Sequence, residues 1–210
     1  MDVFHSELVK GAAFSEKHEF PILEPTYFLP ERAIPFDKAS KAKDHKQWVH
    51  FYIDDYRFER LWNNPKQYLP MLQRFDGVIT PDYSIYKDMP VVMQTWNTYR
   101  NRAMAFWLQK NGVHIVPNIC WNDERSFDFC FEGLSQGCSV AISSNGCLRT
   151  EENRQLFKKG LTAMVEILRP NAIINYGSAS NDIWNPYKER IENIVVIEHY
   201  NITLRRKAVA

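Results

Sequence analysis

The sequence predicts an α/β fold in which parallel strands alternate with helices, and two observations lead to this prediction. Short apolar segments typical of buried strands recur along the chain, with helical segments between them. Each apolar segment ends abruptly in polar residues before the next turn or helix begins. The six predicted strands cover residues 49–53, 77–80, 113–116, 140–142, 172–174 and 194–197.

Strands that alternate with helices are joined by right-handed crossovers, so all six strands would run parallel. Two architectures fit: an incomplete (β/α) barrel of the TIM type, with about six strands, and an open doubly wound sheet. The barrel-like arrangement is favoured because polar residues follow every predicted strand, whereas an open sheet needs them mainly at one crevice. Either way, the polar residues would meet at one face of the molecule.

The helices are recognised by signals at their ends. The longest is predicted over residues 90–111, with Pro90 at its start and Gly112 directly after its end. Apolar residues such as Val92 and Trp96 recur along it every three to four positions and are expected to pack against the core. Further helical segments are predicted at 57–63, 67–73, 124–134, 151–168 and 181–192.

Composition indicates a single domain. The chain has 210 residues, enough to bury one sizeable core, and its 45% hydrophobic and 24% charged residues are typical of globular proteins. Residues 1–47 are rich in proline and lysine and lack clear periodicity. We therefore expect an irregular N-terminal arm over 1–47, packed on a single α/β domain over 48–210.

Charge and hydropathy disfavour several classes of partner. The formal net charge of +1 gives no overall attraction to duplex nucleic acid. No segment reaches the roughly 18 apolar residues of a membrane span, and residues 1–10 do not resemble a signal peptide. The sequence therefore predicts a cytoplasmic protein without membrane contacts.

Motifs of the common enzyme classes are not found. The chain contains no GxGxxG after its first predicted strand, no P-loop, no HExxH and no GxSxG. The four cysteines match no zinc-binding spacing. No motif therefore implies a metal or other cofactor, and the cofactor stays unknown. Candidate site residues are therefore single polar side chains at the ends of the predicted strands.

Three carboxylates are the candidate catalytic residues. Asp82 directly follows the strand at 77–80, where a carboxylate can act as a general base or nucleophile. The alternative is that Asp82 only shapes the loop. Asp123 and Glu198 follow two other strands and are candidates for the second acid–base group, although Asp123 would also suit a helix N-cap.

Amide, hydroxyl and aromatic side chains at the other strand ends suit recognition of a ring. Asparagine amides match the hydrogen-bonding edges of bases or sugars, and an indole stacks on rings, unless Trp121 belongs to the core. Arg149 follows a turn of small residues and could hold an anionic group, or could be an ordinary surface residue. The predicted ligand-binding residues are Asn118, Trp121, Asn122, Ser143, Asn145, Arg149, Asn175 and Ser178.

These residues favour an enzyme that acts on a nucleotide, nucleobase or similar polar cyclic ligand at the carboxyl ends of the strands. A second class stays open, a non-catalytic protein that sequesters a nucleotide or blocks a host protein. The same polar basin would serve it without paired acids. The expected partner is a small polar ligand, with a host protein as the other possibility.

Several short segments also carry a resemblance to a known family. They are residues 81–84 (PDYS), 94–100 (QTWNTYR), 121–123 (WND) and 126–131 (SFDFCF). These segments resemble a domain-of-unknown-function family, number four-four-one-seven, which is common in firmicute genomes and their phages and mobile elements. The resemblance implies a bacterial or phage protein and implies no particular reaction.

A looser likeness concerns layout alone. A strand, Ser143 and Ser144, then Arg149, a helix, a further strand and Gly177 follow one another as in the barrels of tRNA-guanine transglycosylases and phage deazaguanine-DNA enzymes. Those enzymes use aspartates at strand ends on a base. Their zinc-binding Cys/His cluster has no counterpart in this chain, so the likeness is an analogy of fold.

Overall fold

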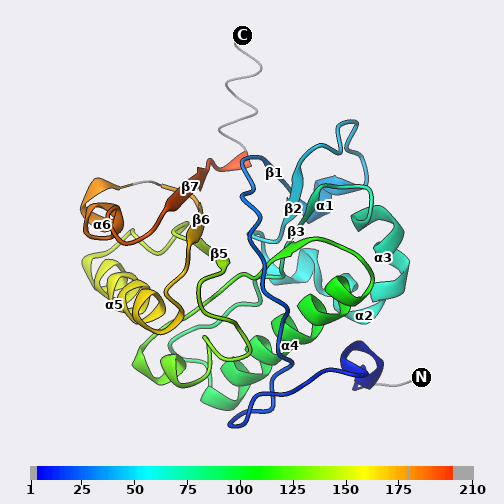
Figure 1. Cartoon of the computed structure of the whole chain (residues 1–210), viewed down its shortest axis with the longest axis horizontal. Helices are drawn as coiled ribbons and strands as arrows, with labels where there is room; N and C mark the ends of the chain where they lie inside the picture. The colour runs from blue at the N-terminus through cyan, green and yellow to red at the C-terminus, as the bar shows by residue number, and fades with distance from the viewer. Residues whose placement is uncertain (1–3, 179, 201–210) are drawn as a thin grey trace.

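The computed structural model describes residues 4–178 and 180–200. Two parallel β-sheets lie among helices, with strand orders β1-β2-β3-β4 and β5-β6-β7 (Figure 1). Parallel pairing throughout both sheets confirms the predicted α/β class. The strands are β1 (Ala33–Pro35), β2 (Trp48–His50), β3 (Gly77–Ile79), β4 (Ile115–Val116), β5 (Ser139–Ser143), β6 (Ala172–Tyr176) and β7 (Asn193–Ile197).

Helices connect successive strands, and two of them are long. The α-helices are α1 (Phe36–Ala39), α2 (Glu59–Asn63), α3 (Pro65–Leu72), α4 (Val91–Lys110), α5 (Glu151–Leu168) and α6 (Asn181–Trp184). The 3-10 helices are η1 (Ser6–Val9), η2 (Asp55–Arg57), η3 (Glu124–Asp128) and η4 (Asn185–Tyr187). Figure 1 shows α5 and α6 beside the second sheet and α1 to α3 beside the first.

Three segments differ from the sequence-based prediction, and one of them is the helix expected over 181–192, which is the short α6 followed by η4. The stretch expected to be irregular, residues 1–47, contains a strand and a helix, β1 and α1. The sequence did not reveal the strand because three residues ending in Pro35 are too few to give a periodic signal. The helix expected over 124–134 is only the short η3. Three consecutive side chains after it are buried, which one face of a helix cannot achieve: Phe129, Cys130 and Phe131.

The two sheets meet edge to edge between β4 and β5. An isolated parallel bridge joins Asn118, just beyond β4, to Ala141 in β5. The Ile119 N–H donates to the Ala141 carbonyl at 2.8 Å, and the Ala141 N–H donates to the Pro117 carbonyl at 2.8 Å. The loop after β4 is therefore fixed to the middle of β5.

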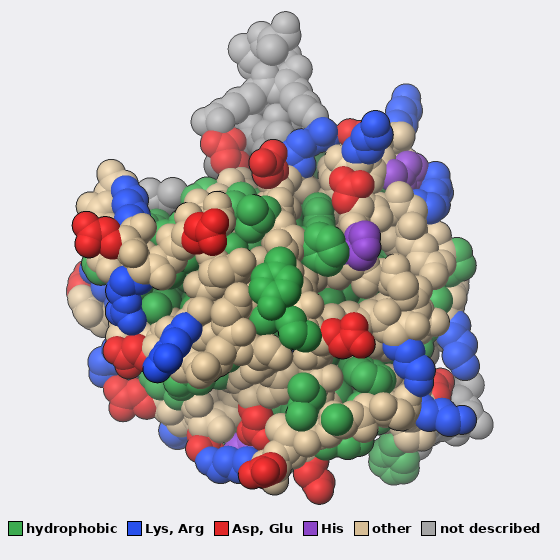
Figure 2. Space-filling view, in the orientation of Figure 1, with side chains coloured by type: hydrophobic (Ala, Val, Ile, Leu, Met, Phe, Trp, Pro, Cys, Tyr) green, Lys and Arg blue, Asp and Glu red, His purple; other side chains and the backbone are tan. Residues whose placement is uncertain are grey.

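Residues 4–32 of the N-terminal arm bind the opposite ends of the same two strands. The Thr26 hydroxyl donates to the Ile115 carbonyl at 2.6 Å, and the Ser139 N–H donates to the Thr26 carbonyl at 2.8 Å. Figure 1 shows this segment, in blue, crossing the front of the molecule. Hydrophobic side chains gather along the middle of that face in Figure 2, in keeping with the exposed arm residues Tyr27 and Phe28.

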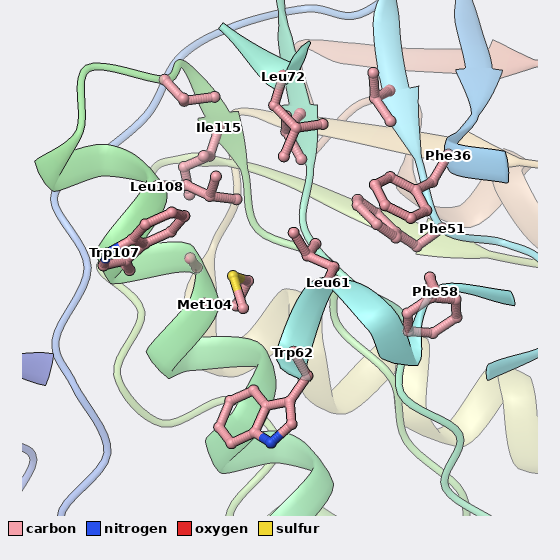
Figure 3. Packing of buried hydrophobic residues seen from close by; sticks show 14 of the residues in the cluster. Phe36, Phe51, Phe58, Leu61, Trp62, Leu72, Met104, Trp107, Leu108 and Ile115 are labelled. Carbon is pink, nitrogen blue, oxygen red and sulfur yellow. The ribbon is translucent and has the colours of Figure 1, made fainter. Parts of the chain in front are cut away.

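Alternate strand positions separate the core into outer and inner clusters. Val49 of β2 and Phe51, just after β2, belong to a cluster that includes residues of α2 and α4. Figure 3 shows Phe51 in this cluster with Leu61 of α2 and Met104 of α4. Burying each such side chain stabilises the fold by roughly 1.5–3 kcal/mol. A separate outer cluster packs α5 on the second sheet.

The inner cluster contains side chains from both sheets. It contains Trp48 and Tyr52 from the β2 side and Ile174 and Tyr176 from β6. The Tyr176 ring lies 4.7 Å from the Tyr52 ring and 4.5 Å from the His50 ring, measured between centroids. Burial among these rings lowers the pKa of His50 to about 3, so this imidazole is neutral at physiological pH.

Helix α4 follows the predicted apolar stripe in its second half and departs from it in its first. Ala103 and Trp107 are buried in the core as expected, whereas Val92 is 74% exposed and Trp96 is 45% exposed. In their place, the polar residues Gln94, Asn97 and Asn101 are buried. Their burial has a local cause, because these amides bind the backbone of the loop that follows β3.

Candidate functional site

The amides of α4 hold the loop after β3 in a fixed conformation. The Asn97 amide donates to the Ser84 carbonyl at 2.6 Å. The Asn101 amide donates to the Pro81 carbonyl at 2.6 Å and to the Thr80 hydroxyl at 3.0 Å. Buried polar groups need hydrogen-bond partners, and the backbone of this loop supplies them to the buried amides of α4.

Arg102 extends the same anchoring to the segments that follow β4. Its guanidinium is buried and donates to the Glu132 carbonyl at 2.9 Å and the Cys130 carbonyl at 2.6 Å. It also donates to the Asn101 side-chain oxygen. Burial lowers the pKa of Arg102 to about 10, which leaves it charged at neutral pH. One helix thus positions the loops after both β3 and β4.

Asp82 lies in the first of these loops and is held by a chain of hydrogen bonds. The Asn118 amide nitrogen donates to Asp82 Oδ1 at 2.7 Å. The Tyr52 hydroxyl donates to the amide oxygen of Asn118 at 2.9 Å. Tyr52 therefore fixes the orientation in which Asn118 presents its N–H to the carboxyl group.

The surroundings of Asp82 raise its affinity for a proton. Burial raises the pKa of Asp82 to about 6, the hydrogen bond from Asn118 opposes the rise, and the negative charge of Asp55 adds to it. Asp55 is itself held in place, because it accepts from the Ser84 N–H at 3.0 Å and from the Ser84 hydroxyl at 2.7 Å. A carboxyl group with this pKa can both accept and release a proton near neutral pH.

Asp82 forms part of the wall of a pocket of about 440 Å³ at the carboxyl ends of β3, β4 and β5. This is the edge where parallel α/β folds place their ligands. The loop after β3 supplies Asp82, Ile85 and Lys87, and the segment after β4 supplies Trp121 and Asn122. The remaining walls include Ile142, Ser143, Asn145, Cys147, Leu156 and Phe157.

Trp121 takes its place in the pocket wall because a glycine in α5 makes room for it. A Cβ atom at Gly160 would lie 2.0 Å from the indole nitrogen of Trp121, far inside contact distance. A glycine in the middle of a helix costs about 1 kcal/mol relative to alanine. Phe157, one turn earlier, lies 5.5 Å from the Trp121 ring between centroids and completes the aromatic wall.

Five of the residues predicted from the sequence line this one pocket: Asp82, Trp121, Asn122, Ser143 and Asn145. A sixth, Asn118, lies directly behind Asp82 and is buried. The strand-end pattern therefore led to residues that the fold brings together.

The two other predicted carboxylates lie outside the pocket lining. Asp123 is the N-cap of η3, where its side chain accepts from the Arg125 N–H at 3.1 Å. Its ion pair with the Arg125 guanidinium holds the pKa of Asp123 below its usual value. Glu198, just after β7, is exposed.

Three predicted ligand-binding residues are also placed elsewhere. Arg149 is exposed ahead of α5 and does not line the pocket. Asn175 is buried in β6, between the inward-facing Ile174 and Tyr176, and its amide donates to the Ser178 carbonyl at 3.0 Å. This hydrogen bond between Asn175 and Ser178 closes the turn after β6.

Comparison with known proteins gives the family. A family model described as "Domain of unknown function (DUF4417)" matches residues 12–199, which include the whole pocket. The chain belongs to this family. No solved structure matches it.

Two phage proteins are similar to this DUF4417 chain. The Gene 1 protein of Mycobacterium phage D29 is 34% identical over 170 residues, and that of Mycobacterium phage L5 is 35% identical over 167 residues. Each match covers 78% of this chain. The chain spans 62% of the D29 protein and 72% of the L5 protein, so both relatives are longer than the region shared.

Sequence reasoning missed several residues that build the DUF4417 pocket. Tyr52 had a usable signal, since strand alternation places it on the same face as Trp48 and His50. Lys87 and Gly160 had none, because their importance comes from contacts with α5 and Trp121 that are distant in sequence.

Two kinds of feature were not found in the described part of the chain. No group of three or more His, Cys, Asp or Glu side chains there is arranged to hold a metal ion. Among the same residues, no helix has the length and apolar character needed to cross a membrane.

Proposed function

We propose that the pocket is an active site for a small polar cyclic compound, such as a nucleobase or nucleotide, and that Asp82 is its acid–base or nucleophilic group. The observation that carries the proposal is the state of this carboxyl group. One oxygen is held by Asn118, no hydrogen bond to the other is found among the described residues, and Asp82 lines a largely apolar pocket. Catalytic carboxyl groups are commonly tuned in this way.

The proposed fold around the site is an incomplete (β/α) barrel. The bridge between Asn118 and Ala141 supports it, because it places β4 beside β5 in one parallel order. The contact of Tyr176 with His50 and Tyr52 supports it too, because residues on the inner faces of opposite strands would meet there. The pocket would then lie at the mouth of the barrel, where enzymes of this architecture bind substrates.

A second candidate is a non-catalytic protein that sequesters the same class of ligand. One observation favours it: Asp82 is the only carboxylate among the residues found to line the pocket. Acid–base catalysis often uses two groups, whereas tight binding needs none. The same non-catalytic class includes a protein that blocks a host protein, and the exposed aromatic residues of the arm, such as Tyr27, would then form the contact surface.

A thermal-shift screen against nucleobases, nucleosides, nucleotides and sugars tests the binding step. A ligand present at about 100 times its Kd should stabilise the protein by about 2.7 kcal/mol. The shift should be lost in Asp82→Asn and kept in Asp123→Asn, since Asp123 lies outside the pocket. A ligand that binds both variants equally would remove Asp82 from the site.

Product analysis of any ligand that binds then separates the two candidates. An enzyme should convert the compound in the unaltered protein and lose conversion in Asp82→Asn. A protein that binds without converting any bound compound would favour sequestration.

A further inference from the structure

Asp82 is a carboxylate without a counter-ion in the wall of the pocket. It belongs to the lining and is half-buried there. One of its oxygens accepts from the Asn118 amide, which carries no charge. Among the described residues no lysine, arginine or histidine pairs with it, and the charged group found to act on it is another carboxylate, Asp55. Because carboxylates in apolar surroundings are normally paired with a positive charge, a bound molecule could supply the charge that is missing here.

The other titratable groups near Asp82 supply no positive charge. Burial is the main cause, and the charge of Asp82 a further cause, of the raised pKa values of Tyr52, Cys120 and Cys147. These three groups are therefore neutral at pH 7. With Asp55 close by, this end of the pocket has a net negative charge.

Lys87 is the one basic residue among those found to line the pocket, and it already has a partner. Its ammonium pairs with Glu152 at 2.5 Å, and 62% of its side chain is exposed. Glu152 does not belong to the lining. The charge of Lys87 is therefore balanced at the outer edge of the pocket, and the charge of Asp82 is left without compensation.

The remaining walls suit a small ring. Ile85, Ile142 and Leu156 supply apolar surface, and Trp121 and Phe157 supply aromatic rings. The volume of about 440 Å³ is within the range of about 300–1,000 Å³ that is usual for small-molecule sites. Aromatic walls also accept a positive charge, because the faces of their rings carry partial negative charge. A ring that carries a positively charged nitrogen therefore complements both the walls and the carboxylate.

We propose that the pocket binds a small cyclic organic cation, with its positively charged nitrogen at the carboxylate of Asp82. The class includes rings with an amidinium group and bases that carry a positive charge because a ring nitrogen is methylated. This inference rests on the proposed function, since it concerns the same pocket and the same carboxyl group, and it narrows the ligand. A phosphate group should weaken binding, because Asp82 and Asp55 would repel it.

Calorimetric titration at pH 7 with benzamidine, benzamide and benzoate tests the inference. These compounds share one ring and a similar size but carry a positive charge, no charge and a negative charge. The pairs 1-methyladenosine and adenosine, and 3-methylcytidine and cytidine, make the same comparison with bases. We expect at least one cation to bind, and to bind at least tenfold more tightly than its neutral partner. Equal or tighter binding of the neutral or anionic partners would overturn the inference but leave the pocket as the proposed site.

Two variants locate the bound charge. Asp82→Asn removes the charge with little change of shape, so it should weaken binding of the cation at least tenfold. This variant should fold, because it removes an unpaired charge from apolar surroundings. Asp123→Asn removes the same charge outside the lining and is the matched control, which should bind the cation as the unaltered protein does. Unchanged affinity of Asp82→Asn for the cation would overturn the inference.

Proton release gives a second measurement of the same contact. The pKa of Asp82 is about 6 in the free protein, so a cation that binds to the ionised carboxylate should displace a proton from it near pH 6. Titrations in two buffers with different enthalpies of ionisation measure this release. The cation should also bind about tenfold more weakly at pH 5 than at pH 7, because most of Asp82 is then protonated.

Cation binding that releases no proton and has the same affinity at both pH values would overturn the inference. Absence of binding by cations, bases, nucleosides, nucleotides and sugars alike would overturn both the inference and the proposed function.

Discussion

Asp82 combines a fixed position with a raised affinity for protons. Asn118 holds one oxygen of its carboxyl group, and Tyr52 holds Asn118. Because burial is the main cause of the raised pKa, ionisation of Asp82 lowers the free energy of unfolding. Two properties of the protein should show this at the scale of single residues.

The first is the dependence of stability on pH. The pKa of Asp82 is about 6 in the folded protein, against an ordinary value of 3.8 for an aspartate side chain, so folding favours the protonated form. The free energy of unfolding should therefore fall as the pH rises from about 4 to 6. Asp82→Asn removes the effect, and it should stabilise the protein by up to roughly 3 kcal/mol at pH 8 and have little effect at pH 3.5.

Urea unfolding of both proteins at the two pH values measures this difference. Asp123→Asn is a control with the opposite sign, because the ionised form of Asp123 is stabilised by Arg125 and its loss should destabilise the protein at pH 8. Equal stability of Asp82→Asn and the unaltered protein at pH 8 would show that Asp82 ionises without cost.

The second property is the positioning of Asn118 by Tyr52. Tyr52→Phe removes the hydroxyl that orients the Asn118 amide, so the hydrogen bond that lowers the pKa of Asp82 weakens and this pKa should rise above 6. The pH at which the stability of the variant changes should move upward accordingly. Tyr83→Phe is the matched control, since the buried Tyr83 hydroxyl has no hydrogen bond among the described residues.

At the scale of elements, α4 anchors the site from behind through its polar face. Arg102→Met leaves the buried carbonyls of Cys130 and Glu132 without donors. Because each charged hydrogen bond contributes about 1.5–3 kcal/mol, we expect a loss of at least roughly 3 kcal/mol in the free energy of unfolding. Chemical denaturation measures it, with the exposed Arg74→Ala as a control that should change stability little. A loss as small as that of the control would contradict the anchoring role.

The same helix shows what its sequence could and could not predict. Its length was predictable from Pro90 and Gly112, and α5 was predicted over the same residues that it occupies. The burial of Gln94, Asn97 and Asn101 was not predictable, because these amides bind backbone groups of a loop that periodicity does not describe. The predicted strand ends identified five pocket residues, because the carboxyl ends of parallel strands lie at the same edge of the sheet whatever the exact lengths of the strands.

At the scale of the whole molecule, the inner cluster makes the two sheets depend on each other. Tyr52 and Tyr176 pack ring to ring, and Thr26 joins β4 to β5. Amide hydrogen exchange should therefore give equal free energies of opening for the central residues of β2 and β6. Exchange that is much faster in one sheet would show two independently unfolding units.

The pairing of the sheets was only partly predictable from the sequence. The alternation of strands and helices indicated the parallel class, but β1 is too short for such a signal. The role of residues 4–32 also depends on distant partners, because Thr26 bonds to Ile115, 89 residues further along the chain, and to Ser139, which is more distant still. Contacts of this kind have no local pattern.

The carbon-13 NMR titration of the Asp82 carboxyl group tests the central claim most directly, with Asp123 observed in the same spectra. We predict a midpoint near pH 6 for Asp82 in the free protein, a midpoint below 3.8 for Asp123, and a change for Asp82 alone when a stabilising ligand is added. A midpoint near 3.8 for Asp82 that no ligand alters would contradict the assignment of this pocket as the functional site.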